Sequence, residues 1–251
     1  MKDPAIEWVG NHQRNSARAL ARLGVDPAKI VPWDWPADLT PRDFPAKKRR
    51  ENAALRLFYA GRIQETKGVG DSLRALALLR GSGLDASLTL AGPGEIDDYR
   101  TLSSTLGVAA HAHFLGRISH SEVVEQMHRH DVVLVPSRHA YPEGLPLTIY
   151  DAFCSRSPLI ASDHPMFRDQ VVDGETALVF RASDANSLAA RAARLAADAG
   201  LYAKLSAASL SAWERLQISV RWGEMLERWL RNAESDREWL AQHSLAAPMS
   251  K

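Results

Sequence analysis

Short apolar runs alternate with longer amphipathic segments from residue 54 onward. The apolar runs end at turn-forming residues and predict strands at 55–60, 87–90, 113–115, 132–135, 159–161 and 177–180. Between them, apolar residues recur at helical spacing and predict helices at 71–80, 96–106, 121–128 and 146–155, with a short helix at 167–172. Strands that are apolar on both sides need cover on both faces. The pattern therefore predicts a doubly wound parallel sheet in a Rossmann-like α/β domain.

The segment before this pattern reads differently. The start of the chain predicts a helix that ends at Gly24. Residues 31–50 contain four prolines, which disfavour a helix and exclude a central strand. We interpret this stretch as a linker packed over a domain surface, with its basic run Lys47–Arg50 in solvent.

The segment after the alternating pattern is helical. Helices follow Arg181, the first with Ser183 or Asp184 as its cap, and they continue to about His243. All seven tryptophans lie outside the predicted sheet: Trp8, Trp33, Trp35, Trp213, Trp222, Trp229 and Trp239. Two interpretations stay open, because large aromatic residues either pack flanking segments onto the core or face a partner domain.

Composition narrows the class of protein. Of the 251 residues, 45% are hydrophobic and 24% charged, and the formal net charge is +1. This balance is ordinary for a globular protein and gives no global field that would recruit nucleic acid. The single cysteine, Cys154, fits a reducing compartment and a buried position. No signal-peptide pattern and no apolar run of the roughly 20 residues of a spanning helix occur. We expect a soluble cytoplasmic protein and leave peripheral membrane contact open.

Two loops that follow predicted strands carry candidate chemistry. The first is the turn Gly61–Gly68, which contains Arg62 and Lys67 and precedes a helix. Glycines let a backbone approach a phosphate, a helix start supplies free N–H groups, and the two cations suit a diphosphate. Exposed basic residues are common in loops, so this signal is modest when taken alone.

The second loop, Pro136–Pro146, is the more informative one. A buried strand ends at Val135, and Pro146 fits the first position of the next helix. That helix start points unpaired N–H donors at the ligand edge of the sheet. Glu143 precedes the helix and Asp151 falls in its second turn, so both acids can accept hydrogen bonds from hydroxyl groups. A ligand that carries both phosphates and hydroxyls is a nucleotide sugar.

The sequence lacks the motifs of metal sites and of other classes of enzyme. The pairs His111-x-His113 and His128-x-His130 have no carboxylate or cysteine at a zinc spacing, so we expect structural roles for them. His139 differs because its loop borders the proposed site. The chain contains no P-loop, no complete G-x-G-x-x-G and no G-x-S-x-G elbow. A nucleotide-sugar epimerase of related fold stays open as an alternative, and it would also need two domains.

Five pieces in order resemble the C-terminal domain of retaining GT-B glycosyltransferases of family four, the glycosyl transferases group 1. They are Gly61-Arg62…Lys67-Gly68, Leu90-Ala91-Gly92-Pro93-Gly94, Phe114-Leu115-Gly116, Asp131…Leu134-Val135-Pro136-Ser137 and Glu143-Gly144…Asp151-Ala152. The likeness covers about 55–230. It implies a hexosyltransferase that uses a nucleotide-diphospho-sugar linked to UDP or GDP. It implies no further cofactor and no divalent metal.

The resemblance also implies residue roles. Arg62 and Lys67 would bind the diphosphate and stabilise its charge as it leaves. Glu143 matches the first acid of the family's E-x7-E motif, close to the transferred sugar, and Asp151 the second acid, which holds the ribose. Further donor contacts, mainly through backbone atoms, are implied for Gly61, Arg117, Gly144, Leu145, Leu147 and Thr148. We take Arg62, Lys67 and Glu143 as the catalytic set.

The chain departs from the family pattern in three ways. Asp151 stands where the family has Glu, so its reach is one methylene shorter, and Asp163-His164 replace a frequent glycine pair. The chain also holds only one full Rossmann-like domain, and the family's acceptor sits in the other. We therefore assign 1–50 to the remnant of an N-terminal domain and linker, 51–200 to the nucleotide-sugar-binding domain and 201–251 to C-terminal helices. The expected partner is an N-terminal acceptor-binding domain or a separate subunit. A non-catalytic donor-binding or scaffold subunit remains the alternative function.

Overall fold

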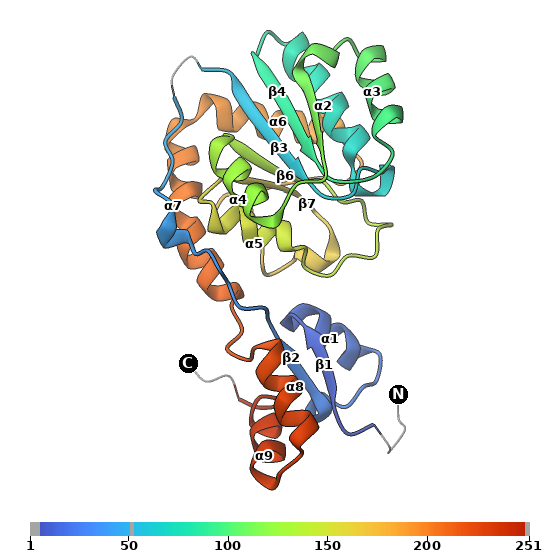
Figure 1. Ribbon diagram of the computed structural model, residues 1–251. Coiled ribbons are helices and arrows are strands. Elements are labelled where there is room, and N and C mark those ends of the chain that lie inside the picture. The colour runs from blue at the N-terminus through green and yellow to red at the C-terminus, as the bar shows by residue number, and fades with distance from the viewer. Residues whose placement is uncertain (1–5, 51–52, 249–251) are drawn as a thin grey trace. The chain divides into compact units, whose positions relative to one another are not determined.

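The computed structural model describes residues 6–50 and 53–248, which form two compact units (Figure 1). Unit 1 comprises Met1–Asp38 and Gln217–Lys251, and unit 2 is Leu39–Leu216. We expected domain boundaries after residues 50 and 200, whereas the compact units divide the chain after residues 38 and 216. The assignment of 1–50 to the remnant of another domain stays a prediction.

Unit 2 is built on a six-stranded parallel sheet with the order β5-β4-β3-β6-β7-β8. Its strands are β3 (Leu55–Ala60), β4 (Ala86–Ala91), β5 (Ala112–Gly116), β6 (Val132–Val135), β7 (Leu159–Ser162) and β8 (Leu178–Phe180). The chain winds outward from β3 through β4 to β5, then returns to β6 beside β3 and winds the other way. The neighbouring strands β3 and β6 therefore mark the topological switch point, where ligands of such sheets bind.

Helices cover both faces of this sheet, which confirms the predicted fold class (Figure 1). One face carries α2 (Val69–Gly81), α3 (Ile96–Thr105) and α6 (Ala185–Ala197); the other carries α4 (His120–Arg129), α5 (Leu147–Cys154) and α7 (Ala199–Leu216). Alternate residues of β3 point to opposite faces of the sheet and pack into the hydrophobic core on each face. Leu57 and Tyr59 pack toward α2, and Phe58 packs toward α5.

The predicted helix at 167–172 is wrong. Only a 3-10 turn, η5 (Pro165–Phe167), forms there. Asp169 adopts a left-handed backbone conformation with φ of 67°, and such a residue cannot continue a right-handed helix. The helices predicted at 71–80, 96–106, 121–128 and 146–155 all form, with ends shifted by a few residues at most.

Unit 1 contains two strands that the sequence analysis missed. β1 (Val9–His12) and β2 (Ile30–Trp33) pair in parallel and are joined by α1 (Arg14–Arg22), and the unit also holds α8 (Trp222–Arg231) and α9 (Glu234–Gln242). We read Pro32 as a linker residue, yet it lies in β2. β2 has a strand partner on one side only, so the missing N–H of proline breaks no ladder there.

The tryptophans of unit 1 gather around its own small core. Val31, Val220 and Met225 are among the buried residues of this core. Partly buried tryptophans pack against it: Trp8, Trp33, Trp222, Trp229 and Trp239. The interpretation as packing residues accounts for these five, whereas Trp35 is 47% exposed.

The basic run Lys47–Arg50 is not a solvated linker throughout. Lys47 Nζ donates to the carbonyls of Met127 and His130, at 2.9 and 2.6 Å, and to Ser157 Oγ at 2.7 Å. The two carbonyls lie at the C-terminal end of α4, where unpaired C=O groups attract a cation. The expectation of solvation failed here because spacing along the chain does not show which carbonyls a lysine meets.

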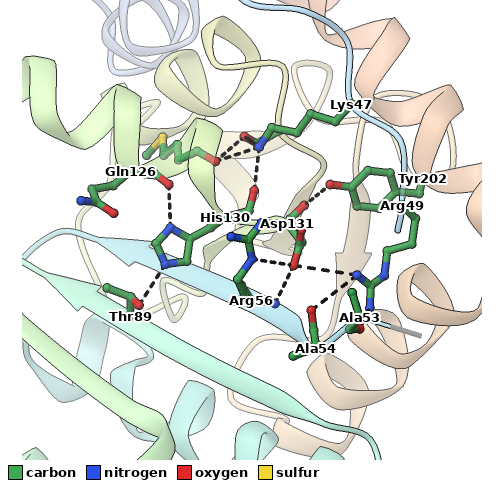
Figure 2. A network of polar contacts seen from close by, with 12 residues as sticks. Lys47, Arg49, Ala53, Ala54, Arg56, Thr89, Gln126, His130, Asp131 and Tyr202 are labelled. Carbon is green, nitrogen blue, oxygen red and sulfur yellow. Dashed lines mark hydrogen bonds and ion pairs between the residues drawn. The ribbon is translucent and has the colours of Figure 1, made fainter. Parts of the chain in front are cut away.

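Arg49 is buried in the same region, where it faces Asp131 (Figure 2). Its side chain is only 5% exposed and lies 3.9 Å from the Asp131 carboxylate, which Arg56 also binds at 3.1 Å. Burial raises the pKa of Asp131, but the contacts with Arg56 and Arg49 outweigh burial and hold this pKa below its ordinary value. Asp131 precedes β6 and Arg56 opens β3, so this network fixes the sheet edge opposite the strand ends described below.

Burial lowers the pKa of Lys47 from 10.5 to about 7, which predicts a specific pH dependence. Between these two values the unfolded chain binds more protons than the folded one, so stability due to Lys47 rises with pH. The free energy of unfolding of the wild type, minus that of Lys47→Met, should rise by up to about 1.4 kcal/mol per pH unit from pH 7 to 10. Urea denaturation at several pH values measures it, and parallel curves would contradict the prediction. Lys48→Met, at an exposed neighbour, is the control that should run parallel to wild type.

Candidate functional site

The two loops singled out in the sequence meet at the switch point. Gly68 ends the loop after β3 with φ of 74°, and a Cβ placed on it would lie 2.1 Å from the carbonyl oxygen of Pro136, just after β6. The Arg138 N–H donates to the carbonyl of Thr66 at 2.9 Å. Parallel neighbours end at the same edge of a sheet, which is why residues far apart in sequence come together here.

Lys67 and Glu143 form an ion pair at the centre of this meeting point. Lys67 Nζ contacts Glu143 Oε1, and the two side chains are only 14% and 7% exposed. Ser137 Oγ donates to the same carboxylate oxygen at 2.6 Å. The ring of Tyr141 lies 4.3 Å from the ammonium and adds a cation–π contact. The sequence indicated Lys67 and Glu143 separately, while Ser137 and Tyr141 gave no signal beyond their place in the loop.

Arg62 stands apart from this pair. Its side chain is exposed, and within residues 6–50 and 53–248 its guanidinium has no hydrogen-bond or ion-pair partner. Its backbone is fixed, because the hydroxyl of Tyr59 donates to the Arg62 carbonyl at 2.6 Å. Gly61, with φ of 151°, starts the turn. Arg62 is therefore an exposed cation on a backbone held by Tyr59, and it does not contact the Lys67–Glu143 pair.

Arg138 is a positioning residue that the sequence analysis missed. Its guanidinium donates twice to the Asp71 carboxylate, both bonds at 2.8 Å, and contacts Glu65 at 2.5 Å. These bonds raise the pKa of Arg138 above its ordinary value. Glu65 belongs to the first loop and Asp71 to the start of α2, so Arg138 ties the second loop to both. A buried partner for Arg138 was not foreseeable from spacing, because Asp71 looked like an ordinary residue of the helix start.

Two helix starts face this edge without side-chain caps. Gly68 precedes α2 and Pro146 precedes α5, and neither side chain caps its helix. The first N–H groups of each helix can therefore bind an anion. Around the start of α5, Gly144 is exposed, Leu145 is buried, Leu147 is 47% exposed and Thr148 is partly buried.

Asp151 does not join the Lys67–Glu143 pair and is held by His120. The Asp151 carboxylate is buried in α5, and its Oδ1 lies 3.0 Å from Nε2 of His120, at the start of α4. Burial raises the pKa of Asp151 above its ordinary value, and the His120 contact works against that rise. His120 follows Arg117, which is exposed in the loop after β5. The sequence analysis indicated Asp151 and Arg117 but missed His120, which lies 31 residues from its partner.

The residues that replace the family's glycine pair tie down the second loop. His139 Nε2 lies 2.8 Å from Asp163 Oδ1, and His164 Nε2 lies 3.1 Å from the carbonyl of Tyr141. Met166 N–H donates to Nδ1 of His164, so the proton of a neutral His164 sits on Nε2 and is donated to Tyr141. Burial lowers the pKa of His164, which favours this neutral form.

A family model and curated relatives match this chain. The family model "Glycosyl transferases group 1" matches residues 42–211. The chain belongs to this family. The glycogen synthase of Mycobacterium tuberculosis (strain H37Rv) is 31% identical over 179 residues, which are 68% of this chain and 38% of that enzyme. The chain thus spans well under half the length of that curated relative.

Solved structures match the fold of this chain. Anabaena HepE in complex with UDP-glucose has a TM-score of 0.70 and 14% identity over 94% of this chain and 63% of that one. The C-terminal domain of a group 1 glycosyl transferase, LpcC, from Francisella tularensis has a TM-score of 0.56 and 21% identity over 76% of this chain and 97% of that one. These likenesses concern the fold and, with the family match, confirm the resemblance to a GT-B C-terminal domain. Among the described residues, no helix is long and apolar enough to cross a membrane.

Proposed function

We propose that unit 2 is the donor-binding domain of a retaining glycosyltransferase and binds a nucleotide-diphospho-sugar at the switch point between β3 and β6. One observation carries the proposal: a lysine and a glutamate from two different loops meet beside two uncapped helix starts. A phosphate requires the cation and the helix N–H groups, and a sugar hydroxyl requires a carboxylate acceptor. An activated sugar presents both groups within one short span.

Phosphate recognition rests on Lys67, Arg62 and the helix starts at Gly68 and Pro146. Together they supply positive charge and fixed donors where negative charge grows on the departing diphosphate. We infer that this arrangement does the electrostatic work for which other transferases use a divalent metal. Gly61 lets the backbone turn close to the phosphates.

Sugar and nucleoside recognition rest on the remaining residues. Glu143 accepts hydroxyls of the transferred hexose and positions it, with backbone atoms of Gly144, Leu145, Leu147 and Thr148 around it. Asp151 is shorter than the family's glutamate and contacts the ring of His120. Asp151 and His120 together hold the ribose, with the His120 ring extending further than the Asp151 side chain. The loop at Arg117 lies against the base. A UDP- or GDP-linked donor fits this set, and a related fold has been solved with UDP-glucose.

Transfer with retention requires an acceptor on the same face of the sugar as the departing phosphate. We place the acceptor in a second domain or in a separate subunit. Unit 1 supports this placement, because β1, α1 and β2 form one β-α-β element, the repeating element of Rossmann-like domains. Two strands alone are at best marginally stable, so we expect this element to be part of a larger sheet.

Titration calorimetry without metal tests the proposal. UDP, GDP and ADP, the matching monophosphates and the sugar conjugates are titrated into the purified chain with EDTA present. We expect one base to bind, with the diphosphate at least about 10-fold tighter than the monophosphate, because the second phosphate reaches Lys67 and the helix starts. Equal affinity for mono- and diphosphate, or binding only with Mg²⁺, would refute the proposed phosphate site.

The alternative is a non-catalytic donor-binding or scaffold subunit. The acid Asp151, shorter than the family's glutamate, favours this alternative. A scaffold whose Lys67 and helix starts do not bind phosphate shows no preference for the diphosphate over the monophosphate. A donor-binding subunit without turnover binds the donor as tightly as the enzyme does, and transfers nothing when its acceptor domain is supplied. The titration and a transfer assay on the complete assembly separate these cases.

A further inference from the structure

We propose that Glu143 makes the site select an intact sugar nucleotide over the bare nucleoside diphosphate, by competing with phosphate for Lys67. The inference rests on the proposed donor site and adds a property to it. Glu143 and the phosphates both need the Lys67 ammonium. Only a ligand with a sugar hydroxyl gives Glu143 a replacement partner.

The geometry of the carboxylate supports this exchange. Both Lys67 Nζ and Ser137 Oγ bind the same oxygen, Oε1 of Glu143. In the part of the chain that the structure describes, nothing donates to the other oxygen, Oε2. Glu143 can therefore keep Ser137 on Oε1 and accept a hydroxyl on Oε2 while Lys67 turns to the phosphates.

Glu143 cannot escape to water when it loses Lys67. Its side chain is 7% exposed, and its backbone N–H donates to the Tyr141 carbonyl at 2.8 Å. His164 holds the same carbonyl, and Arg138 holds the start of the loop against Asp71. A buried carboxylate that loses its cation carries a large penalty, and the Ser137 hydroxyl alone does not offset it. Because the loop is fixed, a ligand that binds Lys67 without donating a hydrogen bond to Glu143 leaves this carboxylate unpaired. Such a ligand therefore binds more weakly.

The consequence concerns the order of events during turnover. An intact donor satisfies both residues, since its phosphates take Lys67 and its sugar donates to Glu143. After the sugar has left, the remaining nucleoside diphosphate faces a carboxylate without a hydroxyl donor. The Lys67–Glu143 pair then reforms and weakens the hold on the product, which helps its release.

Glu143→Gln tests the inference because it keeps the shape and removes the negative charge. UDP against UDP-glucose, GDP against GDP-mannose and ADP against ADP-glucose are titrated into wild type and variant, and the pair with the tighter binding is used. We expect the bare diphosphate to bind about 10-fold tighter to the variant, because Lys67 no longer has a charged competitor. We expect the preference for the sugar conjugate over the bare diphosphate to fall by about the same factor.

Asp98→Asn is the matched control. It removes one negative charge from an exposed position of α3, outside the two loops of the site. It should leave the affinity for the bare diphosphate within about 2-fold of wild type, because charges off the binding contacts are screened. An equal gain in both variants would show a general effect of charge and overturn the inference. If unfolding midpoints show that Glu143→Gln does not fold, Glu143→Ala, which also removes the negative charge, carries the same expectation.

The outcomes separate the two proposals. Tighter binding of the bare diphosphate by Glu143→Gln, with a reduced sugar preference, supports the inference. Unchanged or weaker binding of the diphosphate overturns the inference and leaves the donor site in place. Absence of binding by wild type for every base tested overturns the donor site, and the inference with it.

Discussion

Lys67→Met should lower the affinity for a nucleoside diphosphate by about 100-fold, or ~2.7 kcal/mol, because the variant loses a charge-assisted contact to phosphate. Methionine keeps most of the apolar stem and so keeps the packing on Tyr141. The change also leaves the Glu143 carboxylate without its cation, so a nearby negative charge then repels the phosphates. In the complete enzyme, turnover should fall at least as far, because the same contact stabilises the leaving group.

Three further variants make this prediction decisive. The double variant Lys67→Met with Glu143→Gln removes the unpaired acid, so it should regain stability in urea denaturation while diphosphate affinity stays below wild type. Lys48→Met removes the same charge from an exposed position and should bind as wild type does. Arg62→Ala should weaken binding as well, with little change in stability, because its guanidinium has no partner within the described ranges. Wild-type affinity in Lys67→Met would refute the assigned role of Lys67.

Gly68→Ala should destabilise unit 2 by about 3 kcal/mol, since a side chain there is strained and collides with backbone. The φ of 74° disfavours any residue with a Cβ, and that Cβ would lie 2.1 Å from the Pro136 carbonyl oxygen. Backbone of a neighbouring loop cannot rotate away as a side chain would. The loop after β3 must therefore move off the loop after β6, and we expect donor affinity to fall together with stability.

Gly83→Ala provides the matched control for this prediction. Gly83 has φ of 86°, close to that of Gly68, but a Cβ on it meets nothing within 4 Å. Its substitution should cost about 1 kcal/mol from backbone strain alone. Chemical denaturation of both variants measures the difference, which reports the close contact between the two loops. Equal losses would show that the loops do not depend on this contact.

The sequence was sufficient where the information is local and periodic. β3 and β6 were predicted with their full bounds, because a wholly or mostly apolar run between turn residues leaves few alternatives. The strand β1 was missed, since its four residues mix polar with apolar positions. The strand β2 was missed although its residues are apolar, because Pro32 was taken as evidence against a strand. Whether a proline fits into a strand depends on the number of neighbouring strands.

For the candidate site, the sequence indicated Arg62, Lys67, Glu143 and Asp151 through their loops and their family pattern. Ser137 lies only six residues from Glu143, but a serine in a loop has many ordinary uses. The sequence could not indicate the roles of Arg138, His120 or His164, whose partners lie 67, 31 and 23 residues away. Lys47 and Arg49 were misjudged for the same reason.

The sequence by itself therefore determined the α/β architecture, the two loops and the residue types that suit phosphate and sugar. These follow from hydrophobic period, turn chemistry and spacing, all of which act over a few neighbouring residues. Only the tertiary structure decided that Lys67 meets Glu143, that His120 supports Asp151 and that a buried network closes the opposite sheet edge. Strand order sets these meetings, and it arises from the packing of the whole sheet rather than from any one segment.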